Sequence, residues 1–120
     1  MDIKEASNAF AALSQSTRLA VVRLLIQHGG EGLLAGEIGE RLKVRQNTMS
    51  ANLAVLLNAG LVHNEREGRS IRYFADLVGI QELLAFLMED CCGGNPEICQ
   101  RAIEQIVVAS KGHDYVGSKV

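Results

Sequence analysis

The residues best suited to chemistry are three cysteines that fall within nine positions of one another. Cys91, Cys92 and Cys99 are the only cysteines of the chain, and Gly93-Gly94 lies between them. In a reducing compartment such a cluster is more often a metal or redox site than part of a disulfide framework. Soft ligands select soft centres, and trivalent arsenic and antimony suit three thiolates because a lone pair occupies their fourth direction. The cluster therefore predicts a site that binds arsenite or antimonite, with no organic cofactor.

Two other interpretations of the cluster stay open. Zinc usually has four ligands in a closed site, so it would need a fourth from His113, Glu97 or another subunit. A reversible disulfide between two of the three thiols would instead make the segment a redox sensor. Burial of the cysteines as small apolar side chains does not explain why all of them gather in one segment.

A second group of residues, between positions 41 and 72, is suited to nucleic acid. Six basic and two acidic residues give this stretch a formal charge of +4, although the whole chain carries −2. A basic surface on an acidic protein is typical of a side that faces phosphates. The predicted DNA contacts are Arg45, Gln46, Asn47, Thr48, Ser50, Asn52, Arg66, Arg69 and Arg72. The short polar side chains suit base edges in the major groove, and the arginines suit phosphates or the adjacent minor groove.

The spacing of apolar residues predicts the elements that position these groups. Ile3, Ala6, Phe10 and Leu13 recur at intervals of three and four residues, as on one face of a helix. Helices are predicted over residues 3–13, about 17–28, 34–42, 46–58 and 76–90, and from Asn95 and Pro96 to about residue 110. Ser14 and Ser16 are good N-caps for the second helix, and Gly29-Gly30 ends it.

The middle of the chain predicts a winged helix. The helices over 34–42 and 46–58 are joined by three residues, which is typical of a helix-turn-helix. Strands over 61–65 and 70–74, with a turn at Arg66-Glu67-Gly68-Arg69, form a hairpin directly after it. The predicted fold is therefore mainly α, a winged helix-turn-helix with a two-stranded β-hairpin wing. The second of its two helices would be the recognition helix, with Met49, Leu53 and Leu57 turned inward.

The helix over residues 76–90 has no single clean polar face, which suggests burial on more than one side, as at a dimer interface. A chain of 120 residues buries a modest fraction of its surface, so a homodimer would stabilise it. We predict one DNA-binding and dimerisation domain over residues 1–110, followed by a loose tail over 111–120.

Other functional classes lack their sequence signatures. The chain shows no nucleophile motif, paired catalytic carboxylates or glycine-rich phosphate loop, so we expect no enzyme and no catalytic residues. No apolar stretch approaches the roughly 20 residues that span a bilayer, and the start of the chain lacks a signal-peptide core. We therefore expect a cytoplasmic protein without a membrane partner. A metal chaperone would use the cysteines without needing the basic hairpin.

Several segments resemble the ArsR/SmtB family of metal-responsive repressors. Three segments show this resemblance: Ala11–Leu19, the run from Gly36 to Val62 that ends in Asn-Ala-Gly-Leu-Val, and the predicted wing Arg66–Tyr73. The resemblance spans roughly residues 6–99. It implies a homodimer built from the first and fifth helices, and repression of resistance genes that a ligand relieves. The third helix has no cysteine and the fifth no histidine, so the chain is most similar to the arsenic-responsive branch with thiols at the end of the fifth helix.

The resulting prediction is a repressor that binds double-stranded operator DNA and dissociates when trivalent arsenic or antimony binds Cys91, Cys92 and Cys99. A thiol-redox or zinc-responsive repressor of the same fold is the alternative.

Overall fold

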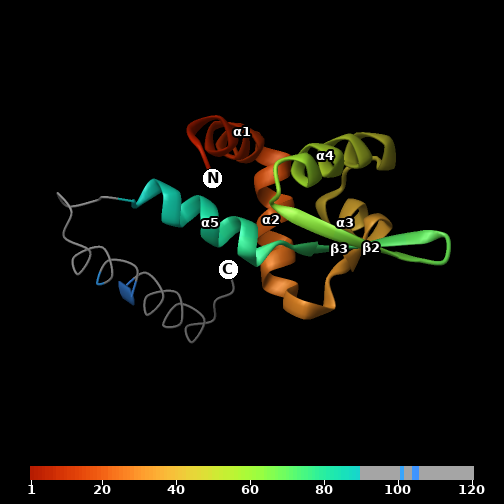
Figure 1. Cartoon of the computed structure of the whole chain (residues 1–120). Coiled ribbons are helices and arrows are strands. Elements are labelled where there is room, and N and C mark those ends of the chain that lie inside the picture. Colours follow the sequence, from red (N-terminus) through yellow and green to blue (C-terminus); the bar gives the residue numbers. More distant parts are fainter. Residues whose placement is uncertain (90–100, 102–103, 106–120) are drawn as a thin grey trace. The chain divides into compact units, whose positions relative to one another are not determined.

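The structure is a computed structural model that describes residues 1–89, 101 and 104–105. Residues Met1–Phe86 form one compact unit, and the chain from Leu87 onward belongs to a second. The elements are α1 (Ile3–Leu13), α2 (Ser16–His28), the 3-10 turn η1 (Gly29–Glu31), β1 (Leu33–Leu34), α3 (Ala35–Leu42), α4 (Gln46–Asn58), β2 (Val62–Glu67), β3 (Ser70–Ala75) and α5 (Leu77–Leu87), shown in Figure 1. The predicted winged helix-turn-helix is confirmed, because α3, a three-residue turn and α4 precede the β2–β3 hairpin. Most of the last predicted helix, the boundary at residue 110 and all three cysteines lie outside the described residues; Arg101, Glu104 and Gln105, which are described, are helical.

The sheet has three antiparallel strands in the order β1-β3-β2, one more than the sequence predicts. Leu33 in β1 pairs with Tyr73 in β3, and β2 pairs with β3 from Val62 opposite Ala75 to Glu67 opposite Ser70. A two-residue strand carries no alternating pattern, so only its pairing with β3 identifies β1. The hairpin strands are also longer than predicted. Arg66 and Glu67 belong to β2, and the turn is reduced to Gly68-Arg69.

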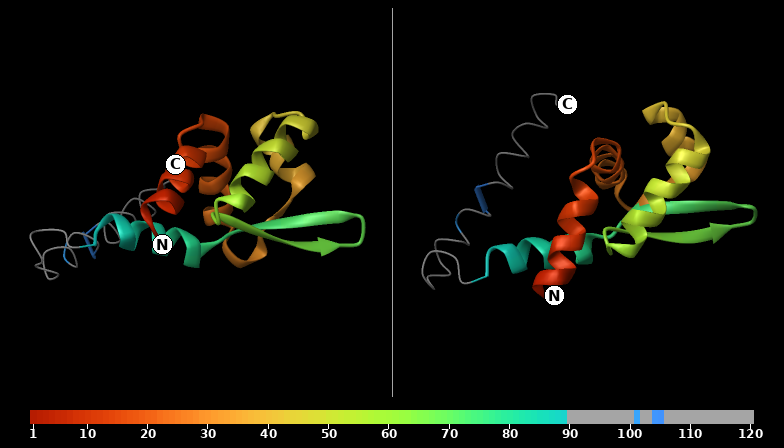
Figure 2. Two further views of the ribbon diagram at one scale, coloured as in Figure 1. Left: turned by 45° about the horizontal axis from the view of Figure 1, so that its top comes forward. Right: turned by 90° about the horizontal axis from the view of Figure 1, so that it is seen from above.

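The core lies where α2, α3 and α4 meet the sheet. Fully buried side chains there include Leu25, Ile38, Met49, Leu53 and Leu61. The β2–β3 hairpin extends away from the helices in both views of Figure 2. The wing is therefore anchored at its base and exposed at its tip.

The helix ends differ from the prediction at one corner. The side chain of Gln15, and neither Ser14 nor Ser16, caps α2 by accepting from the backbone N–H of Arg18 at 2.9 Å. Ser14 instead closes α1, where its hydroxyl donates to the carbonyl of Ala11 at 2.8 Å. The two helices follow each other so closely that Ser14 is the C-cap of α1 and Ser16 is already the first residue of α2, which leaves Gln15 as the N-cap.

Helix α5 keeps much of its apolar surface exposed. Leu83 is its buried residue, whereas Leu77, Val78 and Leu84 are 59%, 66% and 52% exposed. The burial on more than one side that the sequence suggests is therefore not supplied by Met1–Phe86 alone.

No single helix among the described residues is long and apolar enough to cross a bilayer; α1 with α2 and η1 would reach that length only as a pair bent by 95°.

Candidate DNA-binding surface

The turn between α3 and α4 is tight enough to fix the two helices against each other. Lys43 ends α3 in the left-handed conformation with φ of 58°, and Val44 donates to the carbonyl of Gly39 at 2.9 Å. A Cβ at Gly39 would collide with the side chain of Gln46 and lie 3.0 Å from the carbonyl oxygen of Val44. A side chain at position 39 would therefore displace the side chain of Gln46 and press on the carbonyl of Val44, so the start of α4 lies directly over this glycine.

Helix α4 presents a polar face at its beginning. Met49, Leu53 and Leu56 are its buried residues, and Leu57, predicted to be inward, is half-buried. Arg45, Asn47, Thr48 and Ser50 are exposed. Asn47 also accepts from the backbone N–H of Thr48 at 2.9 Å through its side-chain oxygen. Three short polar side chains and one arginine are thus exposed at the N-terminal end of α4, and a major groove is wide enough to admit a helix.

Two of the predicted base-reading residues are held by the protein itself. Gln46 donates from Nε2 to the carbonyl of Ala35 at 3.3 Å. Asn52 is half-buried, and its Oδ1 accepts from Arg18 Nη1 at 3.1 Å. Arg18 also donates from Nε to the carbonyl of Ala12 at 2.8 Å. These contacts make Asn52 part of the support of α4, whereas Gln46 stays exposed at the start of the helix together with Asn47, Thr48 and Ser50.

The three predicted wing arginines differ in their surroundings. Arg72 donates to both carboxylate oxygens of Glu67, at 2.6 and 3.4 Å, and to the carbonyl of Glu31 at 3.1 Å. Its hydrogen bond with Glu67 raises the pKa of Arg72, against the smaller opposing effect of desolvation. Arg66 donates to the carbonyl of Gly68 at 3.3 Å at the tip of the wing. Within the described part of the chain, Arg69 makes no ion pair or hydrogen bond, so its donors face solvent.

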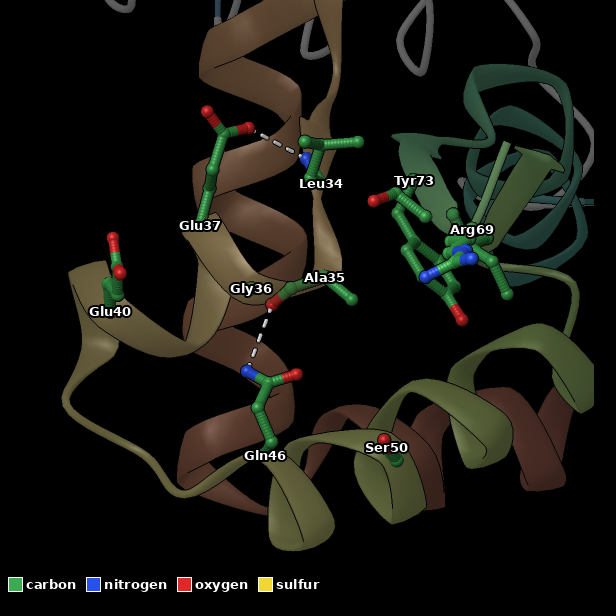
Figure 3. A pocket seen from close by; sticks show the side chains of 11 residues that line it. Leu34, Ala35, Gly36, Glu37, Glu40, Gln46, Ser50, Arg69 and Tyr73 are labelled. Carbon is green, nitrogen blue, oxygen red and sulfur yellow. Dashed lines mark hydrogen bonds between the residues drawn. The ribbon is translucent and has the colours of Figure 1, made fainter. Parts of the chain in front are cut away.

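A polar opening of about 480 Å³ separates α4 from the wing. Figure 3 shows Gln46 and Ser50 on α4, with Arg69 and Tyr73 across from them on the wing side. Glu37 and Glu40 of α3 line the other end, and Glu37 accepts from the backbone N–H of Leu34 at 2.8 Å. The opening therefore has hydrogen-bond donors on its wing side and carboxylates on its α3 side. The sequence did not single out Tyr73 as a functional residue, because an aromatic residue inside a strand is expected to serve the core.

The predicted metalloid ligands stay predictions, because Cys91, Cys92 and Cys99 lie outside the described residues. Among the residues that the structure describes, no group of three or more histidine, cysteine, aspartate or glutamate side chains is arranged to hold a metal ion.

Comparisons with known proteins agree with this geometry. A family of helix-turn-helix domains matches residues 13–65, from the end of α1 into β2. The uncharacterized HTH-type transcriptional regulator YbzH of Bacillus subtilis (strain 168) is 34% identical over 95 residues, which cover 69% of this chain and 95% of that protein. An ArsR-like transcriptional regulator from Rhodococcus sp. RHA1 is 31% identical with a TM-score of 0.63, covering 86% of this chain and 92% of that one. The chain belongs to the ArsR family of helix-turn-helix transcriptional regulators.

This ArsR-family regulator is also similar to the transcriptional repressor SdpR of Bacillus subtilis (strain 168), with 28% identity over 82 residues that cover 68% of this chain and 88% of SdpR. The helix-turn-helix match includes α3, α4 and their connecting turn, so the exposed start of α4 belongs to the DNA-binding domain of the regulator. The family predicted from the sequence is thus confirmed, whereas its arsenic-responsive branch stays a prediction.

Proposed function

We propose that this ArsR-family regulator is a homodimeric repressor that leaves its operator when trivalent arsenic or antimony binds Cys91, Cys92 and Cys99. The observation that carries the DNA-binding part is the exposed polar start of α4 beside Arg69 of the wing, which has no partner among the described residues. A recognition helix with short polar side chains can read base edges in the major groove, and wing arginines can bind the backbone or the adjacent minor groove. The similarity to the repressor SdpR supports repression as the direction of regulation.

The homodimer is supported by apolar surface on two helices. Ile3 and Phe10 on α1 are 72% and 39% exposed, and Val78 and Leu84 on α5 are 66% and 52% exposed. Surface of this kind is buried favourably against a second copy of the chain. A two-fold dimer would present two copies of α4 to successive major grooves, about 34 Å apart along the DNA.

The inducer is proposed from the chemistry of the three thiols. Cys91 follows the end of α5 at Leu87 by four positions. An ion bound by all three thiolates would constrain the segment next to the proposed dimer helix and change the spacing of the two α4 helices. Coupling free energies between two binding sites are typically about 1–3 kcal/mol, which is enough to release a repressor from DNA.

The test is a fluorescence anisotropy titration of the reduced protein on duplex DNA from its own promoter, with arsenite, antimonite, zinc and peroxide added in separate experiments. We expect salt-sensitive binding that arsenite or antimonite reverses. Release by zinc alone or by peroxide alone would replace the metalloid with those inducers. A wild-type protein that does not bind the promoter DNA under any condition would refute the repressor.

Cysteine variants separate sensing from DNA binding. Replacing Cys91, Cys92 or Cys99 by serine should abolish release by arsenite and leave the affinity for DNA within about twofold of wild type, because serine lacks a thiolate but is close in size. Loss of DNA binding in all three variants would show that the cysteines serve the fold and would contradict this separation.

A further inference from the structure

Tyr73 is a buried residue with a hydroxyl whose purpose the fold does not explain. Tyr73 lies on the central strand β3, opposite Leu33 of β1 and Asn64 of β2, and only 7% of its surface is exposed. Its ring belongs to the core cluster. Within the described part of the chain, no hydrogen bond to the phenol oxygen is formed. Buried hydroxyls of tyrosine usually find a partner.

The place where Tyr73 reaches the surface indicates what the missing partner is. Tyr73 lines the opening of about 480 Å³ between α4 and the wing, together with Ser50 of α4 and Arg69 of the wing (Figure 3). Ser70 of the wing also lines it. These four residues offer three hydroxyls and a guanidinium. A set of this kind matches the oxygens of a phosphate group, which accept several hydrogen bonds and carry negative charge.

The location matches a phosphate of DNA more closely than a free anion. With a recognition helix in the major groove and a wing at the adjacent minor groove, the sugar-phosphate strand that separates the two grooves passes between these two elements. Glu37 and Glu40 line the α3 side of the opening, so an anion is favoured only at the wing side, where Arg69 and Tyr73 lie.

We propose that Tyr73, with Arg69, Ser50 and Ser70, forms a site for one backbone phosphate of the DNA strand between α4 and the wing. This inference rests on the proposed DNA-binding function. It assigns Tyr73 as a DNA-binding residue that positions the protein on the duplex without reading a base.

The variant Tyr73→Phe tests the site, because it keeps the buried ring and removes only the hydroxyl. The free protein should be as stable as wild type or more stable, because an unpaired buried donor is removed. The affinity for promoter DNA and for random duplex DNA should fall by the same factor, about fivefold to tenfold, because a phosphate contact carries no sequence information. Because the proposed dimer places one such site in each subunit, the slope of log affinity against log salt should stay unchanged in Tyr73→Phe and become shallower by about 2 in Arg69→Ala.

Two controls identify the partner. Tyr115→Phe removes the only other phenol hydroxyl of the chain and should change neither stability nor affinity. Promoter duplexes with a neutral methylphosphonate at successive backbone positions should contain one position in each half-site that weakens wild-type binding by a larger factor than it weakens Tyr73→Phe, in which Arg69 still contacts that phosphate. Inorganic phosphate, compared with chloride at equal ionic strength, should not compete with DNA at this site.

The outcomes separate this inference from the proposed function. If wild type binds promoter DNA and Tyr73→Phe binds equally well, the phosphate site is refuted while the repressor stands. A loss of stability in Tyr73→Phe would show that the hydroxyl serves the fold, and a loss confined to promoter DNA would show that it reads a base. Competition by inorganic phosphate that Tyr73→Phe abolishes would assign the site to a free anion instead.

Discussion

Lys43 holds the turn between α3 and α4 in a backbone conformation that a side chain disfavours. It is the only non-glycine residue of the described chain with positive φ, at 58°. The left-handed conformation costs a residue with a Cβ about 1–2 kcal/mol. Glycine avoids this cost, but it loses more conformational entropy on folding, which offsets part of the gain. The strain is small, and the turn places Gln46 directly over Gly39.

We therefore predict that Lys43→Gly raises the free energy of unfolding by about 0.5–1 kcal/mol. Urea denaturation monitored by circular dichroism measures the change. Lys43→Ala is the control, because it removes the same charge but keeps the Cβ. If alanine stabilises as much as glycine does, the gain comes from the charge and the backbone explanation is wrong.

Gly79 is required for a different reason, which is space. A Cβ at this position would collide with the carbonyl oxygen of Gly60, where the first turn of α5 meets the turn after α4. Backbone atoms cannot move aside as a flexible side chain does.

Gly79→Ala should therefore lower the free energy of unfolding by about 1–3 kcal/mol, the usual cost of overpacking. Gly36→Ala is the matched control, since Gly36 is also helical but has open space around it. That substitution should stabilise the protein by up to about 1 kcal/mol through helix propensity. Thermal unfolding measures both changes. If both substitutions shift the unfolding temperature in the same direction, the packing explanation is wrong.

At the scale of elements, Arg18 joins three helices. Its guanidinium donates to the carbonyl of Ala12 at the end of α1 and to Asn52 on α4, at 2.8 and 3.1 Å. The last carbonyls of a helix have no hydrogen-bond partner within it. A positive charge at the C-terminal end of α1 also interacts favourably with the dipole of that helix. One side chain from α2 thus closes α1 and holds the recognition helix.

We predict that Arg18→Ala lowers the free energy of unfolding by about 1–3 kcal/mol, because it leaves two partly buried acceptors without their donor. Arg23→Ala, an exposed position on the same helix, should change it by less than about 0.5 kcal/mol. In a double-mutant cycle, Asn52→Ala should cost less in the Arg18→Ala background than in wild type. Equal costs in the two backgrounds would show that the observed contact has no energetic weight.

The base of the wing is held in a comparable way. Arg72 connects Glu67 on β2 with the carbonyl of Glu31 in η1, two segments far apart in sequence. The hydrogen bond with Glu67 raises the pKa of Arg72, so its guanidinium stays charged and the contact does not weaken near neutral pH. Arg72 therefore stiffens the wing, and Arg69, at the turn, has its donors available for DNA.

At the scale of the whole molecule, burial of the exposed apolar residues of α1 and α5 against a second copy of the chain should be favourable. Val78 and Leu84 lie six positions apart on α5 and are more than half exposed. Because the proposed dimer supplies two copies of α4, the affinity for DNA should depend on this surface.

Leu84→Glu should convert the dimer to a monomer, because a carboxylate in an apolar interface loses its hydration without gaining a partner. Sedimentation equilibrium measures the mass, and anisotropy on promoter DNA should show a loss of affinity of at least tenfold. Glu82→Gln, an exposed change on the same helix, is the control. A Leu84→Glu protein that remains dimeric would place the interface elsewhere.

The sequence by itself determined the order of the described helices and of the hairpin that follows them. The bounds of α1 and α4 agree with the predicted helices over residues 3–13 and 46–58, and the order of helix-turn-helix and basic hairpin determined the fold class. These features depend on apolar periodicity, capping and turn residues, which act between positions a few residues apart. The local patterns were therefore sufficient for them.

The tertiary structure decided which of the predicted DNA-contact side chains also bond within the protein. Asn52 and Arg72 belong to the same basic and polar pattern as Ser50 and Arg69, yet their partners lie 34 and 41 residues away, at Arg18 and Glu31. The short strand β1 and the role of Tyr73 depend on the same kind of distant pairing. No local pattern encodes such contacts, because the partner of a polar group is chosen by the packing of elements that meet only in the folded chain.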